Sequence, residues 1–86
     1  MARVKICRTT NLEDALYAVS CGADALGFIF YPRAAACVSP EGAAEIVKGL
    51  PPFVTPVGVF VDESPDRVAG IAGVAGLRAI QLHGDE

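Results

Sequence analysis

Residues 25–30 read "ALGFIF", a continuous apolar run with no polar residue to face water. Such a run is typical of a strand that is covered on both faces, as in parallel α/β sheets. Three further stretches have the length and apolar character of strands: "RVKIC" (3–7), "TPVGVFV" (55–61) and "AIQLHG" (79–84). The sequence therefore predicts four strands, which are separated by segments of different character.

The segments between the strands have the features of helices. The apolar residues of "NLEDALYAVSCGA" (11–23) recur at the spacing of one helical face: Leu12, Ala15, Leu16 and Val19. Asn11 is a suitable N-cap for this helix, and Gly22 suits its end. Ser39 and Ser64 are each followed by proline, which favours a helix start at both places. The helix after Ser64 has three internal glycines, so its propensity is weak.

The alternation of strands and helices predicts a parallel sheet with right-handed crossovers. Two architectures fit this order, an open doubly wound sheet and a piece of a (β/α) barrel. A dinucleotide-binding sheet would carry a G-x-G-x-x-G turn after its first strand, but "CRTTNLED" (7–14) has no glycine. In a barrel, function lies at the carboxyl ends of the strands. The residues there are Cys7, the segment 31–38, Asp62 and "QLHGDE" (81–86).

Composition excludes several classes of protein. The net charge is −3 and the seven lysines and arginines are scattered, so no basic face for nucleic acid is expected. The sequence has no apolar run of about 18 residues, so no membrane span is expected. The start of the chain lacks the apolar core of a signal peptide. The three cysteines have no C-x-x-C spacing, which argues against a disulfide framework and against a zinc site. Reduced thiols in a cytoplasmic protein are expected.

Several motifs occur together along the whole chain. They are "KIC", "LEDA", "GADALGFIFYP", "VSPE", "PPFVTPVGVFVDESP" and "IQLHGDE". In this combination the sequence resembles the phosphoribosylanthranilate isomerases of tryptophan biosynthesis. The resemblance implies a (β/α)8 TIM barrel, of which residues 1–86 would be the N-terminal half, with four strands and three helices. A barrel of this type needs about 200 residues or more, so an incomplete domain is expected.

The resemblance also implies an activity. The family converts N-(5'-phosphoribosyl)anthranilate by an Amadori rearrangement to 1-(o-carboxyphenylamino)-1-deoxyribulose 5-phosphate. A general acid acts at the ring oxygen and a general base at C2′, and no metal or cofactor is needed. The cysteine of the "KIC" motif corresponds to Cys7 and is the expected base. The "QLHG" segment lines the substrate pocket, which makes His83 and, more weakly, Gln81 expected substrate contacts.

The candidate residues also have ordinary structural readings. A free cysteine at the end of a strand is usually a small buried apolar residue, and this reading is kept for Cys21 and Cys37. Asp62 is either a neighbour of the pocket or an aspartate flanking a helix. Asp85 and Glu86 are expected to be solvated.

The sequence departs from the family pattern at two places. Arg8 follows Cys7 where the family usually has glycine, which would allow a tight turn. Ala36, in "PRAAACVSP" (32–40), stands where the family usually has an arginine that binds the substrate. The family's general acid, on the fifth strand, and its phosphate site lie beyond residue 86. The chain alone is therefore expected to be inactive.

Two other interpretations stay open. A four-stranded half barrel has two open edges, so the chain could be a self-associating structural module without catalysis. It could also come from a different phosphosugar-binding barrel. The expected partners are the small-molecule substrate together with either the C-terminal half of the barrel or a second copy of the chain.

Overall fold

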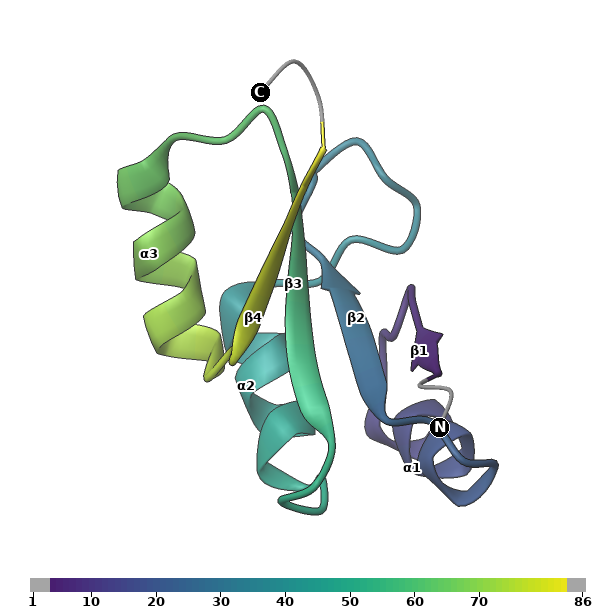
Figure 1. The fold of residues 1–86 in the computed structure, drawn as a ribbon. Coiled ribbons are helices and arrows are strands. Elements are labelled where there is room, and N and C mark those ends of the chain that lie inside the picture. Colours follow the sequence, from purple (N-terminus) through teal and green to yellow (C-terminus); the bar gives the residue numbers. More distant parts are fainter. Residues whose placement is uncertain (1–3, 84–86) are drawn as a thin grey trace.

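The computed structural model describes residues 4–83. Strands and helices alternate along the chain, as the sequence predicts (Figure 1). The elements are β1 (Lys5–Ile6), α1 (Leu12–Ser20), β2 (Ala25–Ile29), α2 (Pro40–Lys48), β3 (Thr55–Val61), α3 (Pro65–Ala75) and β4 (Ala79–His83).

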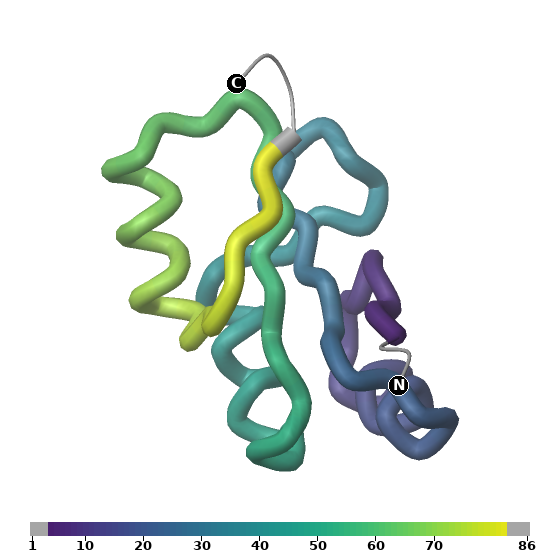
Figure 2. Tube along the Cα trace, in the orientation of Figure 1, coloured from purple at the N-terminus to yellow at the C-terminus, as the bar shows by residue number. Residues whose placement is uncertain are grey.

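The four strands form one parallel sheet in the order β1-β2-β3-β4, which is the order of the chain. Lys5 lies opposite Ala25, and Ala25 lies opposite Thr55. All strands run in one direction, so the connections that leave their carboxyl ends gather at one edge, as the tube in Figure 2 shows for the segments after β2 and β3. This is the edge at which the sequence places the functional residues.

The three predicted helix starts are confirmed. The side chain of Asn11 accepts a hydrogen bond from the Asp14 backbone N–H, which caps α1. Ser39 and Ser64 cap α2 and α3 in the same way, with Pro40 and Pro65 at the first helical position. The weak α3 is supported by its packing on α2 and on the core rather than by its intrinsic propensity.

The core lies between the helices and one face of the sheet. Its buried residues come from all three helices, from β2 and the residue after it, and from β3: Ala15, Leu26, Phe28, Phe30, Ala43, Ile46, Phe60, Val68, Ile71 and Ala75. The rings of Phe30 and Phe60 stack with their centroids 5.3 Å apart. Because side chains alternate along a strand, the residues between these lie on the opposite face. We call that opposite face the open face.

The N-terminal part of the fold differs from the sequence-based prediction. Of the described residues 4–7 in the predicted strand "RVKIC", only Lys5 and Ile6 form β1, which pairs with β2. On the predicted apolar face of α1, Leu12 and Leu16 are 37 % and 42 % exposed, and of the helix only Ala15 is fully buried. The reason is that α1 and β1 stand at the edge of the sheet, where no further element covers them among residues 4–83.

Two apolar grooves mark the two edges of the sheet. One has a volume of about 310 Å³ and lies between β1 and α1, where Val4 and Ile6 face Tyr17 and Ala18. The other, of about 330 Å³, lies between α3 and β4 and is lined by Pro65, Val68, Ala69, Ile80 and Leu82. Val4, Ile6, Ile80 and Leu82 are all exposed. The fold thus leaves matching apolar surface at both ends of its sheet.

Across residues 4–83, none of the helices combines the length and the apolar character that crossing a lipid bilayer requires.

Candidate active site

Cys7 lies directly after β1, at the carboxyl edge of the sheet. The alternation of β1 puts it on the open face with Lys5, and its side chain is exposed. Its neighbour on β2 is Gly27: a Cβ built on Gly27 would lie 3.1 Å from the Cys7 Sγ and 3.2 Å from the Cys7 Cα. The absence of a side chain at Gly27 therefore makes room for the thiol. The sequence analysis did not single out Gly27, although a glycine inside an apolar strand signals a close backbone approach.

The turn after Cys7 is tied back to the sheet. The Thr9 N–H donates to the Gly27 carbonyl oxygen at 3.1 Å, and Thr9 is buried. Because this hydrogen bond continues the pairing of β1 with β2, it fixes the chain on both sides of Cys7.

Arg8 adopts a backbone conformation that L residues rarely take. Its φ is 66°, in the left-handed region, which costs about 1–2 kcal/mol for a residue other than glycine. The expectation that a glycine would suit this turn is consistent with that geometry. Asp62, directly after β3, has a φ of 49°, a conformation that aspartate tolerates better. Two strands thus end in the same kind of turn.

Replacement of Arg8 by glycine should stabilise the chain. The left-handed strain disappears, while the greater freedom of glycine in the unfolded chain offsets part of the gain, so we expect about 0.5–1 kcal/mol. Urea unfolding followed by circular dichroism measures the difference. Arg33→Gly is the matched control, since Arg33 is exposed and has no positive φ; it should not stabilise. A loss of stability in Arg8→Gly would contradict the strain argument.

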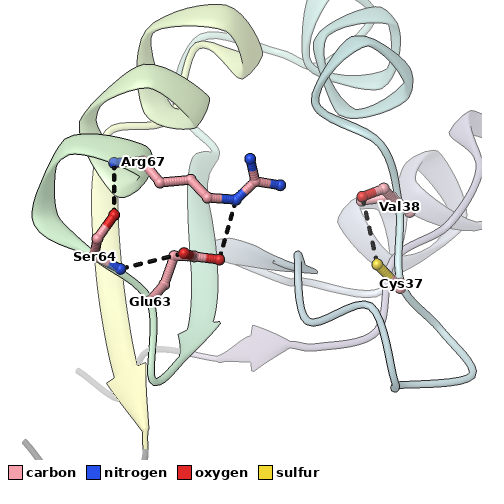
Figure 3. A network of polar contacts seen from close by, with 5 residues as sticks. All are labelled: Cys37, Val38, Glu63, Ser64 and Arg67. Carbon is pink, nitrogen blue, oxygen red and sulfur yellow. Dashed lines mark hydrogen bonds and ion pairs between the residues drawn. The ribbon is translucent and has the colours of Figure 1, made fainter.

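The segment between β2 and α2 folds as a compact loop above the carboxyl edge. The Ala34 N–H donates to the Tyr31 carbonyl, and the Cys37 N–H donates to the Ala34 carbonyl. The Cys37 thiol points to the Val38 carbonyl oxygen, 3.7 Å away (Figure 3). Ala36 is half-buried and offers no polar group. The alanines of this loop, Ala34, Ala35 and Ala36, therefore offer a ligand methyl groups only, beside the exposed Arg33.

The connection from β3 to α3 carries a polar network (Figure 3). The Glu63 carboxylate accepts hydrogen bonds from the Ser64 N–H at 3.2 Å and from the Arg67 Nε at 3.1 Å. The Ser64 hydroxyl oxygen accepts one from the Arg67 N–H at 3.3 Å. These contacts hold the start of α3 in place, directly after Asp62. They are structural contacts, and apart from the Ser-Pro helix start no sequence pattern predicts them.

The end of β4 brings Gln81 to the open face. Its side-chain oxygen accepts a hydrogen bond from the Lys5 ammonium, across the whole width of the sheet. The backbone of His83 lies opposite Val61, level with the end of β3. Asp85 and Glu86 lie outside the described residues. The Lys5–Gln81 contact was not predicted, because no local pattern links residues so far apart in the chain.

Cys21 and a further cavity lie away from this edge. Cys21 follows α1 and is exposed, so the expectation that it is buried is wrong; Cys37 is half-buried in its loop. A cavity of about 410 Å³ lies at the amino ends of the strands, lined by residues such as Val4, Asp24 and Phe53. Residues 4–83 contain no cluster of histidine, cysteine, aspartate and glutamate suited to a metal ion.

Comparison with known proteins identifies the family. Residues 4–86 match the family described as N-(5'phosphoribosyl)anthranilate (PRA) isomerase. The isomerase of Thermotoga neapolitana is 63 % identical over all 86 residues, and that of Geobacter sp. strain M21 is 54 % identical. In both comparisons the whole chain covers 42 % of the relative, so it spans less than half of their length.

Solved structures give the same result for the fold. The crystal structure of phosphoribosyl anthranilate isomerase from Thermotoga maritima matches the whole chain with a TM-score of 0.98 and 56 % identity, and the match covers 42 % of that protein. The enzyme from Thermus thermophilus matches 99 % of the chain with a TM-score of 0.96 and 48 % identity, over 42 % of its own length. The four strands and three helices thus correspond to part of a TIM barrel, and the chain belongs to the N-(5'-phosphoribosyl)anthranilate isomerase family.

Proposed function

We propose that residues 1–86 form the N-terminal half of a phosphoribosylanthranilate isomerase barrel and supply its general base, Cys7. The observation that carries the proposal is the place of this thiol. It stands at the carboxyl end of β1, on the open face, with the space beside it cleared by Gly27. In a (β/α)8 barrel that place is the mouth, where the catalytic groups of the fold lie.

The reaction assigns a clear task to Cys7. After the sugar ring opens to an imine, the base removes the proton from C2′, and the electrons move into the imine, which makes a metal or a cofactor unnecessary. Thiols ionise nearer to neutral pH than hydroxyls do, which suits them to this role. His83 and Gln81 are proposed substrate contacts. The acid that protonates the ring oxygen and the phosphate site would come from the second half of the barrel.

An assay of the separated and the combined halves tests the proposal. The chain is measured alone and after co-expression with the part of the Thermotoga neapolitana isomerase that follows the matched region, by the loss of anthranilate fluorescence as substrate is consumed. We expect no turnover from the chain alone and measurable turnover from the combination. A folded, associated pair without turnover would contradict the assignment.

Ala36 offers a second test, because the family places a substrate-binding arginine there. Ala36→Arg in the combined barrel should lower KM about tenfold or more, since a charged hydrogen bond contributes about 1.5–3 kcal/mol. Steady-state kinetics measure the change. Ala35→Arg, on the exposed neighbour in the same loop, is the control and should leave KM unchanged. An equal effect of both substitutions would show a general charge effect rather than a specific contact.

A self-associating module is the second candidate function. It is favoured by the two apolar grooves at opposite edges of the sheet, because a second copy could cover them. One related structure is that of monomers derived from a dimeric phosphoribosylanthranilate isomerase of Thermotoga maritima. Sedimentation of the chain alone distinguishes this candidate, which requires a stable homodimer.

We also assign the chain to the cytoplasm, because its cysteines are unpaired.

A further inference from the structure

The ammonium of Lys5 places a positive charge on the open face of the sheet. The alternation of β1 puts Lys5 on this face, since Val4 and Ile6 face α1 across the edge groove. Its partner is the neutral side-chain oxygen of Gln81 on β4, and no ion pair of Lys5 occurs among residues 4–83. Asp24 lines the same cavity as Lys5 and accepts the Val4 N–H at 2.9 Å, but no ion pair joins its carboxylate to the Lys5 ammonium.

Closing the barrel would remove this cation from water. Lys5 is exposed in the half barrel, whereas the interior of a complete (β/α)8 barrel is filled by packed side chains. An ammonium in such a place needs an opposite charge, because desolvation costs several kcal/mol and a neutral amide does not compensate it. The strands of this chain cannot supply that charge, since β1 to β4 contain no aspartate and no glutamate.

We propose that Lys5 selects the partner that completes the barrel: a half barrel with an inward-facing carboxylate that pairs with the Lys5 ammonium. This inference rests on the proposed function, which makes the C-terminal half the partner. A second copy of the chain is a less suitable partner than the C-terminal half. In a two-fold closed barrel, the Lys5 side chains of both copies would enter one interior from opposite walls, with no carboxylate on any strand. The same residue therefore favours the C-terminal half and disfavours the homodimer.

Association measurements test the first part of the proposal. The chain and its Lys5→Met variant are each combined with the C-terminal part of the Thermotoga neapolitana isomerase, and the dissociation constants are compared by titration calorimetry. Removal of one member of a buried charge pair should weaken the association about 30-fold or more. Lys48→Met is the control, because Lys48 is exposed on α2 and contacts Glu45 of its own helix. Equal or tighter association of Lys5→Met overturns the proposal.

Zero-length crosslinking identifies the pair without any substitution. A carbodiimide joins an amine to a carboxylate in direct contact, so it should link Lys5 to an aspartate or glutamate of the C-terminal half, as peptide mass spectrometry would detect. The Lys48–Glu45 pair, 3.8 Å apart, serves as the internal positive control. A combined barrel in which Lys48 is linked and Lys5 is not overturns the proposal.

Sedimentation equilibrium of the chain alone tests the second part. Lys5→Met should self-associate at least about tenfold more tightly than the unchanged chain, because the repulsion between two ammonium groups is gone. A tight homodimer that Lys5→Met does not strengthen overturns the selection against a second copy.

The outcomes separate this inference from the proposed function. A Lys5 crosslink without turnover leaves the inference standing and contradicts the catalytic assignment. Turnover of the combined barrel, together with unchanged association of Lys5→Met, supports the catalytic assignment and contradicts the inference about Lys5. If the unchanged halves fail to associate at all, both are wrong.

Discussion

Cys7→Ser should lower the turnover of the combined barrel by about 10²–10⁴-fold, the usual contribution of a general base. Serine keeps nearly the same shape at the end of β1, next to Gly27, but its hydroxyl does not ionise near neutral pH and so cannot accept the C2′ proton. The loss should appear in kcat, with KM nearly unchanged, because the thiol acts on the proton rather than on substrate binding. Single-turnover fluorescence measurements resolve the chemical step.

Cys21→Ser provides the matched control for this experiment. Cys21 is exposed at the end of α1, away from the carboxyl edge of the sheet, so the same substitution should leave turnover unchanged. A Cys7→Ser barrel that keeps its rate within a factor of ten, while remaining folded and associated, would show that another group removes the proton.

The largest effect on stability is expected for Phe60→Ala. Phe60 is 1 % exposed, and its ring stacks on Phe30 in the core between sheet and helices. Truncation of a buried phenylalanine costs about 3–5 kcal/mol. A short chain with uncovered apolar edges has a small free energy of unfolding to lose, so we expect most of the variant to be unfolded at 25 °C. Far-ultraviolet circular dichroism with urea titration measures this.

Phe53→Ala is the control for the core substitution. Phe53 is 74 % exposed in the connection between α2 and β3, so removal of its ring should change the free energy of unfolding of the isolated chain by about 0.5 kcal/mol at most. If both variants unfold at the same urea concentration, the core described here does not determine the stability of the chain.

The order and the helix starts of the fold follow from local sequence. A side chain that caps its own helix, as Asn11, Ser39 and Ser64 do, depends on residues three positions away, and so does the period of an amphipathic helix. Each continuous apolar run likewise predicts a strand from neighbouring residues alone. For the strands and the helix starts, the sequence predictions agree with the structure to within one or two residues at each end.

The predictions were poorer wherever a residue depends on a distant neighbour. The exposure of Leu12 and Leu16 depends on what lies beyond the edge of the sheet. The roles of Lys5 and Gly27 depend on contacts across the sheet, with Gln81 and Cys7. Periodicity carries no information about such pairs.

The order of the strands has a consequence for synthesis on the ribosome. Lys5 pairs with Ala25, Ala25 with Thr55, and Val57 with Ala79, so each new strand docks on the one that emerged just before it. Assembly can therefore proceed unit by unit during translation, as in repeat proteins, with short loops to close at every step. The bond between Lys5 and Gln81, 76 residues apart, is the exception. It can form only when the fourth strand has emerged, so its formation marks the completion of the four-stranded sheet.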